Sequence, residues 1–472
     1  MTASTDVPAT LRNLTFDEIA IGARASLTRT ADARDIALFA AVSGDINPAH
    51  MDPRFAASDR FGHVVLHGMW TAALVSAVLG TRLPGPGTIY LGQELRFLRP
   101  VRPGDSVTAT VTVLEKDAAK GHVKLDTQCT TGDGTVVLAG LATVLAPTES
   151  IEWPSMPVPD VAVQRHDRYA QVLAQARELG PMRVAVVHPC SVEALAAALE
   201  ARDEGLLDPV IVAPEARLRG LAEQAGLSLA GLRIEAVEHS HAAAQRGVEL
   251  AVRGQVAALM KGSLHTDELL AAIVAPDSGL HTGRRISHVY AMDVPTYPKP
   301  LIITDAAINI APTLEHKRDI CQNAIDLLHA MGVERPRVAV LAAVETVMAS
   351  MPATLDAAAL TVMAARGQIT GAEVDGPLAF DNAISLAAAH TKGIVSSVAG
   401  AADILLVPEL EAGNMLAKQL IYLAGADAAG LAVGARVPVV LTSRADSLRV
   451  RLASVALARL VAARRAAVPP ST

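Results

Sequence analysis

Residues 39–56, FAAVSGDINPAHMDPRFA, hold the densest set of side chains capable of chemistry in the first third of the chain. Asp45 and His50 are separated by a segment that contains Asn47 and Pro48, residue types that suit a tight turn. If the turn brings the two side chains together, a carboxylate and an imidazole can share one water and move its proton, which is general acid–base chemistry. The alternative is an Asx turn at Asp45 with His50 as an ordinary loop residue, and the spacing alone favours that alternative.

A second segment adds a candidate oxyanion site. FGHVVLHGMWTAALVSAVLG places Gly68 at the predicted start of an apolar helix. Backbone N–H groups at a helix start carry partial positive charge and suit an oxyanion or enolate. Gly68 has no Cβ, so a substrate carbonyl can approach closely. Gly68 as a packing glycine is the alternative.

Polar residues recur after apolar runs in the last two thirds of the chain. Lys261-Gly262-Ser263, Thr304-Asp305, Glu409 to Asn414 and Ser443-Arg444 each follow a predicted strand. Small residues combined with Lys or Arg suit an anion, and together these segments favour a phosphate-bearing ligand over merely solvated loops. Cys190 also ends a predicted strand, where we interpret it as a small packing residue rather than a reactive thiolate.

The elements that must position these residues divide the chain into two domains. Residues 1–146 combine one long apolar helix with alternating strand-like segments, which predicts an antiparallel sheet curled around a single helix, an α+β arrangement. Residues 147–163 are rich in proline and predict a linker. Residues 164–472 alternate short apolar runs with helical patterns, which predicts an α/β domain with a mostly parallel sheet and helices on both faces.

Composition limits the function classes. The 472 residues are 51% hydrophobic and 19% charged, enough for two or three packed domains. Lys plus Arg total 41 against 48 Asp plus Glu, which argues against a nucleic-acid partner. The three cysteines lack CxxC spacing, so neither a disulfide framework nor a thiolate zinc site is expected.

The chain is expected to be a soluble cytoplasmic protein without a membrane partner. The amino terminus shows no basic region followed by an apolar block, so no export signal is predicted. Residues 64–81 carry no formal charge but include His67, Gly68 and Thr71, and we interpret them as a buried helix rather than a membrane span. Motifs of P-loop kinases, dinucleotide-binding enzymes, nucleophile-elbow hydrolases and H-E-x-x-H metalloproteases do not occur.

The first domain resembles the MaoC-like hotdog hydratases, specifically the (R)-specific enoyl-CoA hydratases. The matching residues are Phe39, Ser43-Gly44-Asp45, Asn47-Pro48, His50 and Ala56, together with PGPGTIYLGQELRFLRPVRPGD at 84–105, and the resemblance covers roughly residues 12–146. It implies that Asp45 and His50 hold the water added to a trans-2-enoyl-CoA and that Gly68 donates its N–H to the thioester oxygen. It further implies substrate contacts at Ser43 and Asn47. Because family members pair two hotdogs, it also implies a homodimer or a higher homo-oligomer.

The second domain resembles the phosphate acetyl/butyryltransferase family over roughly residues 164–462. Six ordered segments carry the resemblance: MKGSLHTDELL, RRISHVYAMDVP, LIITDAAINIAPTLEHKRDICQNAI, VDGPLAFDNAIS, ADILLVPELEAGNMLAKQL and VPVVLTSRADS. It implies an isocitrate/isopropylmalate-dehydrogenase-like α/β fold of two subdomains. The implied reaction is acyl-CoA plus inorganic phosphate giving acyl phosphate plus CoA, with no metal and no cofactor beyond these substrates.

This resemblance also implies roles for individual residues. Arg444 would clamp the phosphate, and Ser443 would hydrogen-bond the CoA thiol or the acyl oxygen. Further substrate-binding candidates are Lys261, Asp305, Asn309 and Asn414. Acetyl-type members often carry a carboxylate where Val450 stands here, so the SRADS ending looks closer to the butyryl-type branch.

The sequence therefore predicts a bifunctional CoA-thioester enzyme, an enoyl-CoA hydratase joined to a phosphate acyltransferase. The alternative is a hydratase that carries a catalytically inactive, acyl-CoA-sensing or oligomerising domain. Ser443 and Arg444 favour the active transferase, whereas Val450 keeps the alternative open.

Overall fold

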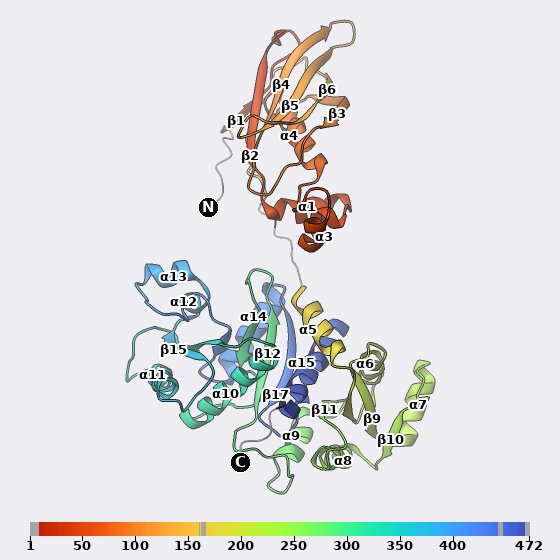
Figure 1. Cartoon of the computed structure of the whole chain (residues 1–472), viewed down its shortest axis with the longest axis vertical. Helices are drawn as coiled ribbons and strands as arrows, with labels where there is room; N and C mark the ends of the chain where they lie inside the picture. Colours follow the sequence, from red (N-terminus) through yellow and green to blue (C-terminus); the bar gives the residue numbers. More distant parts are fainter. Residues whose placement is uncertain (1–8, 160, 162–166, 442–446, 468–472) are drawn as a thin grey trace. The chain divides into compact units, whose positions relative to one another are not determined.

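The computed structural model describes residues 9–159, 161, 167–441 and 447–467. The chain divides into two compact units, Met1–Val163 and Gln164–Thr472. Each unit has a sheet of its own (Figure 1). The predicted domain limits at 146 and 163 stay predictions, although the division between the units falls at the end of the predicted linker.

The first unit is built on a five-stranded antiparallel sheet. In spatial order the strands are β2 (Arg24–Thr30), β4 (Ser106–Asp117), β5 (His122–Thr131), β6 (Val136–Leu145) and β3 (Ile89–Phe97). Along the first eight residues of β4 and of β5 every second residue is buried, because alternate side chains point to the same face of a strand. This is the half-buried pattern that the sequence predicted.

The buried face of this sheet packs against α4 (Gly68–Thr81). Trp70, Leu74, Val75 and Val78 on α4 are buried in one cluster with the inward residues of the strands. This arrangement is a hotdog fold, as predicted. No helix among the described residues is long and apolar enough to cross a membrane, α4 included.

Three short helices precede α4 and form the loop region beside its start. They are α1 (Ala33–Ser43), α2 (Pro48–Met51) and α3 (Pro53–Ser58). Asp32 caps α1 in a capping box with Asp35, while proline occupies the first position of both α2 and α3.

Part of the predicted linker packs onto the first unit. Its residues Glu152–Pro154 form β7, which pairs antiparallel with β1 (Thr10–Arg12). The side chain of Asn13 joins the same segment, donating to Glu149 O and accepting from the N–H of Ile151. The sequence did not reveal this short strand for two reasons. A strand of three residues shows no measurable alternation, and the surrounding prolines are typical of segments outside strands.

The second unit holds an eleven-stranded sheet. Its spatial order is β10 (Arg233–Ala236), β9 (Leu207–Ala213), β8 (Met182–Val187), β11 (Ala258–Lys261), β18 (Val439–Val440), β17 (Asp427–Val433), β12 (Ser287–Asp293), β13 (Leu301–Thr304), β16 (Ile404–Leu406), β14 (Arg337–Leu341) and β15 (Glu373–Leu378). The five strands from β10 to β18 are parallel, and so are the four from β13 to β15. The predicted mostly parallel sheet is confirmed.

Three consecutive antiparallel pairings interrupt the sheet at its centre. They join β18 to β17, β17 to β12, and β12 to β13. Three reversals make the two parallel halves run in opposite directions. The carboxyl ends of the strands in the two halves therefore point in opposite directions, a feature that the sequence pattern of βα units did not reveal.

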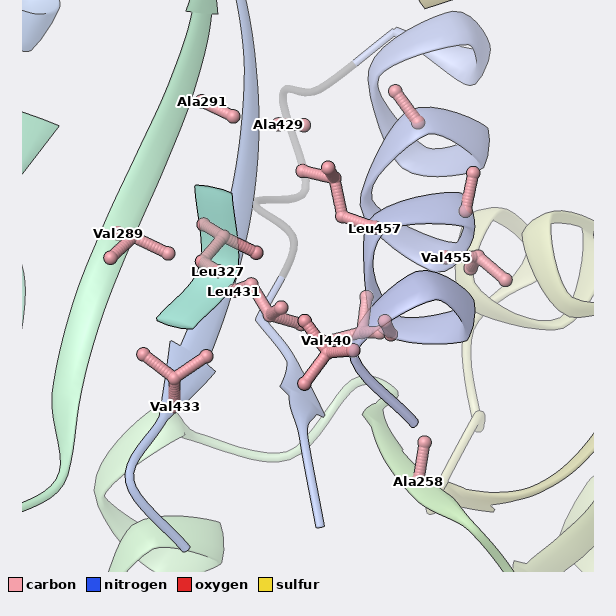
Figure 2. Packing of buried hydrophobic residues seen from close by; sticks show 14 of the residues in the cluster. Ala258, Val289, Ala291, Leu327, Ala429, Leu431, Val433, Val440, Val455 and Leu457 are labelled. Carbon is pink, nitrogen blue, oxygen red and sulfur yellow. The ribbon is translucent and has the colours of Figure 1, made fainter. Parts of the chain in front are cut away.

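Helices cover the second sheet. They are α5 (Asp167–Glu178), α6 (Val192–Asp203), α7 (Glu215–Ala225), α8 (Ser240–Val252), α9 (Thr266–Val274), α10 (Leu314–Ala330), α11 (Pro352–Ala365), α12 (Phe380–Ile384), α13 (Leu386–Thr391), α14 (Leu410–Leu423) and α15 (Leu448–Ala467). Figure 2 shows Leu457 of α15 on the side of the helix that faces Leu431 and Val440 of the central strands, and all three belong to one buried cluster. This core fixes the antiparallel centre of the sheet.

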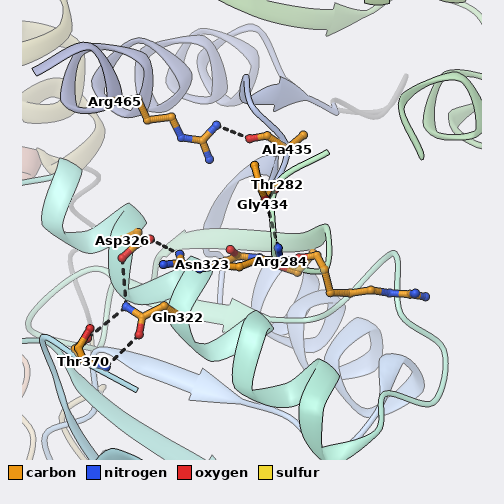
Figure 3. A network of polar contacts seen from close by, with 11 residues as sticks. Thr282, Arg284, Gln322, Asn323, Asp326, Thr370, Gly434, Ala435 and Arg465 are labelled. Atoms are coloured by element: carbon orange, nitrogen blue, oxygen red, sulfur yellow. Dashed lines mark hydrogen bonds and ion pairs between the residues drawn. The ribbon is translucent and has the colours of Figure 1, made fainter. Parts of the chain in front are cut away.

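A polar network anchors α10 beside this core (Figure 3). The amide of Gln322 accepts from the backbone N–H of Thr370, donates to its carbonyl oxygen, and donates to Asp326 as well. Asp326 is also paired with Arg284. Because each of these side chains already has a partner within the fold, we interpret the network as structural.

Candidate active sites

The loop that carries Asp45 begins where α1 ends. Gly44 adopts a left-handed conformation (φ 75°) at the C-cap of α1, which a glycine accommodates without strain. Asp45 then accepts a hydrogen bond from the N–H of Asn47 at 3.2 Å, so the predicted Asx turn is present. Asn47 caps α2 by accepting from the N–H of Ala49 at 3.1 Å. The turn and the proximity to His50 occur together, so the two sequence interpretations were not exclusive.

His50 is oriented by one backbone contact. Its Nδ1 lies 2.8 Å from the carbonyl oxygen of Val65. A carbonyl oxygen only accepts, so in the neutral ring Nδ1 carries the hydrogen and Nε2 keeps its lone pair. This is the tautomer that a general base requires at Nε2.

His67 lies close to Asp45 and to His50, and the sequence did not predict it as a site residue. Its side chain is 2% exposed, and its Nε2 lies 2.9 Å from the backbone oxygen of Asp45 and 4.0 Å from a carboxylate oxygen of the same residue. Its ring centroid lies 4.1 Å from that of His50. The one sequence signal was its place directly before Gly68.

Gly68 is the first residue of α4 and is exposed. A Cβ at this position would lie 3.0 Å from the ring of Phe97, so glycine keeps a narrow approach to the helix start open. Because His67 contacts Asp45 and precedes Gly68 directly, one dipeptide links the acid–base pair to the predicted oxyanion donor.

Ser43 and Asn47, predicted to bind substrate, make loop contacts in the structure. The Ser43 hydroxyl donates to Phe39 O at 2.6 Å and accepts from the N–H of Asp45 at 3.2 Å. Together with the Asn47 cap, these bonds shape the loop. Direct substrate contact by either side chain stays a prediction.

One group of the described residues has the spacing of metal ligands. Donor atoms of Asp45, His50 and His67 all lie within 4.8 Å of one another. However, His50 Nδ1 and His67 Nε2 both face backbone carbonyl oxygens. A metal ion could therefore be bound only by the other nitrogen of each ring, His50 Nε2 and His67 Nδ1. The geometry also suits an acid–base pair with a supporting imidazole, and metal-free chemistry stays the prediction.

In the second unit, Lys261 ends β11, beside the carboxyl end of β18. Its ammonium group lies 3.3 Å from Gly262 O and 3.4 Å from Leu264 O. Ser443 and Arg444 fall outside the described residues, two and three positions after Leu441 in the sequence. The structure thus describes the strand that leads to them but not the predicted pair itself.

Asp305, Asn309 and Asn414 form a group in the other half of the sheet. Asp305 follows β13 directly and accepts from the N–H of Ala307 and of Ile308, both at 3.0 Å, and from the Asn309 amide at 2.5 Å. Asn414 on α14 donates to Ala306 O at 3.1 Å. The strands that lead to this group and to Lys261 run in opposite directions, and the register across β18, β17 and β12 places Thr304 level with Met260.

His288 on β12 is a second residue that sequence reasoning missed. It is fully buried, and desolvation lowers its pKa, an effect that the nearby Asp305 carboxylate opposes. A Cβ on Gly430 would lie 3.1 Å from both His288 Nε2 and Leu441 O, so a glycine is required where β17 passes between them. His288 therefore lies close both to Leu441 and to Asp305.

Burial also raises the pKa of the Cys190 thiol, in agreement with a packing role.

Comparisons with known proteins assign each unit to a class. A family model described as MaoC like domain matches residues 18–133. A second model, described as Phosphate acetyl/butaryl transferase, matches residues 235–459. The fold and the order of the two matches define a chain with a MaoC-like hotdog domain followed by an acyltransferase domain.

Individual relatives match the second unit over nearly their whole length. The phosphate acetyltransferase of Rhizobium meliloti is 57% identical over 315 residues, which cover 67% of this chain and 97% of that protein. The phosphate butyryltransferase of Clostridium beijerinckii is 40% identical, covering 63% and 98%. A branched-chain phosphotransacylase from Enterococcus faecalis V583 is similar in structure, with a TM-score of 0.53, 31% identity and coverage of 59% and 99%. The chain belongs to the phosphate acetyl/butyryltransferase family.

Proposed function

We propose that the first unit hydrates trans-2-enoyl-CoA thioesters to (R)-3-hydroxyacyl-CoA. The observation that supports this proposal is the cluster of Asp45, His50 and the N-terminus of α4. A water held by the Asp45 carboxylate and the Nε2 of His50 would give its oxygen to C3 of the enoyl group, while a proton is delivered to C2. The N–H of Gly68 would hydrogen-bond the thioester oxygen, where negative charge develops.

The stereochemistry of the product tests this proposal. Crotonyl-CoA is incubated with the full chain in water, and the 3-hydroxybutyryl-CoA formed is resolved on a chiral phase. We expect the R enantiomer. The S enantiomer, or no product from a folded protein, would contradict the proposal.

His67 is expected to act as a positioning residue for hydration. His67→Leu removes the donor to Asp45 O, and we expect kcat to fall about 10- to 100-fold with KM little changed, because small misplacements of catalytic groups have large effects. His67→Gln places an amide N–H close to the position of Nε2 and should recover part of the rate. The measurement is steady-state hydration from pH 5 to 9, with the half-buried, remote His122→Leu as a control. A displaced acidic limb in His67→Gln would instead indicate that His67 itself exchanges the proton.

We infer that the second unit transfers an acyl group between CoA and inorganic phosphate. A phosphate oxygen would attack the thioester carbonyl, the C–S bond would break, and CoA would leave as a thiolate that takes up a proton. Family membership and the sequence Ser443-Arg444 support this inference. Comparison of acetyl-, butyryl- and isobutyryl-CoA as substrates tests the acyl group. The greater identity to the acetyl-type relative favours acetyl-CoA, whereas Val450, buried in α15, favours the longer chains.

We also propose that the chain forms a homodimer or a higher homo-oligomer. Strand β3 lies at an edge of the hotdog sheet and exposes apolar side chains, among them Ile89, Leu91 and Phe97, each about half exposed. An unpaired edge with exposed apolar residues is suited to pairing with a second copy. Sedimentation equilibrium tests this proposal, and a monomer at micromolar concentration would contradict it.

A further inference from the structure

Arg285 is held by a buried pair of polar side chains. Its Nε donates to the Asn309 amide oxygen at 2.8 Å. The Asn309 amide nitrogen donates to Ile286 O at 2.9 Å and to Asp305 at 2.5 Å. Asp305 and Asn309 are 2% and 4% exposed. Every hydrogen-bonding group of the Asn309 side chain is therefore used within the protein.

This arrangement changes the interpretation of two predicted substrate-binding residues. Burying a carboxylate and an amide is costly unless both are hydrogen-bonded, and here the partners are the backbone of residues 307–309 and Arg285. Asp305 and Asn309 are positioned to orient Arg285 rather than to contact a ligand themselves.

The guanidinium of Arg285 is exposed beyond this anchor. Within residues 9–159, 161, 167–441 and 447–467, the Arg285 side chain makes its hydrogen bond through Nε, and Nη1 and Nη2 have no partner. Its backbone N–H is bound by Asp319, whose other carboxylate oxygen is paired with Arg318. The adjacent Arg284, in contrast, is paired with Asp326. An oriented guanidinium with both terminal nitrogens open suits a phosphate oxyanion.

Strand register separates Arg285 from Leu441, the last described residue before the predicted Ser443-Arg444 pair in the sequence. Tyr290 of β12 lies level with Gly430, and the pairing of Leu431 with Val440 puts Leu441 at that same level. Arg285 precedes Tyr290 by five residues, which corresponds to up to about 17 Å along an extended chain. Strand β18 runs in the same direction as β12, away from Arg285. A ligand that extends from Arg285 to the level of Leu441 must be long, and CoA carries its nucleotide phosphates at the far end of the pantetheine arm from its thiol.

We propose that Arg285, oriented by Asn309 and Asp305, binds the nucleotide phosphates of CoA in the second unit. The proposal rests on the proposed transferase function and adds to it a site for the distal end of the substrate. Phosphate oxygens of CoA accept hydrogen bonds from Nη1 and Nη2. The Nε–H stays on Asn309.

The test compares the full-length wild type with Arg285→Ala and with Arg284→Ala, a matched loss of one neighbouring arginine. CoA binding is measured by calorimetry, which needs no turnover. We expect the Kd of Arg285→Ala for CoA to rise about 10- to 100-fold, the range for losing charge-assisted hydrogen bonds, and that of Arg284→Ala to stay within about twofold. Pantetheine, which lacks the nucleotide, should bind all three proteins equally.

Steady-state turnover then distinguishes binding of the CoA nucleotide phosphates by Arg285 from binding of the phosphate group of acyl phosphate. With acyl phosphate and CoA as substrates, Arg285→Ala should raise KM for CoA and leave KM for acyl phosphate unchanged. An unaltered Kd for CoA, an equal loss in Arg284→Ala, or a change in KM for acyl phosphate alone would overturn the proposal. If the wild type binds CoA but transfers no acyl group, the transferase function fails while the calorimetric result still decides the role of Arg285.

Discussion

Asp45→Asn is expected to abolish hydration of crotonyl-CoA, with a loss of about 10²- to 10⁴-fold, the usual contribution of general acid–base catalysis. The asparagine can still accept from the N–H of Asn47, so the turn that holds the loop is retained. What is lost is the negative charge that polarises the shared water. The decrease in absorbance of the enoyl thioester measures the rate.

The matched control for this substitution is Asp59→Asn. Asp59 accepts from the N–H groups of Phe61 and Gly62 in a turn of the same unit and has no proposed catalytic role. Its variant should hydrate like the wild type, and both variants should keep phosphate-dependent acyl transfer. Hydration by Asp45→Asn near the wild-type rate would show that the proposed acid–base pair is wrong.

Arg444→Ala is expected to raise the KM for inorganic phosphate or to abolish acyl transfer, with a loss of about 10²- to 10³-fold, in the range found when a preorganised donor to developing charge is removed. Arginine offers two parallel N–H donors to phosphate, so Arg444→Lys should recover little of the loss. The rate of CoA thiol release at varied phosphate concentration measures the effect. Hydration by the first unit should not change.

Arg436→Ala serves as the control for loss of positive charge in the same unit, because Arg436 is exposed and follows the sharp turn after β17. Its phosphate dependence should match that of the wild type. If Arg444→Ala also kept the wild-type phosphate dependence, Arg444 would not belong to the phosphate site.

The hotdog site was largely predictable because its chemistry is local in sequence. Asp45, His50 and Gly68 lie within 24 residues, and turn-forming residues indicated how the chain returns. His67 was missed because a histidine within an apolar segment reads as a core residue. Its contact with Asp45 O depends on how α4 approaches the loop, and periodicity carries no information on that approach.

The second unit was predictable as a class but not as a site. Alternating strands and helices indicated a mostly parallel sheet, yet the three antiparallel pairings at its centre depend on which strands become neighbours. Substrate binding by Lys261 and Asp305 stays a prediction, because the strands that lead to these residues run in opposite directions. Asp305 and Asn309 were selected as polar residues after a strand, and only their burial shows that they hold Arg285.

Phosphate-dependent release of free CoA thiol from a panel of short acyl-CoAs tests whether the chain combines acyl transfer with hydration. We expect release that rises with phosphate concentration, while the same preparation hydrates crotonyl-CoA whether or not phosphate is present. No release by a folded protein that still hydrates crotonyl-CoA would contradict the claim of two activities. It would leave one enzyme attached to a domain that senses acyl-CoA or assembles the oligomer.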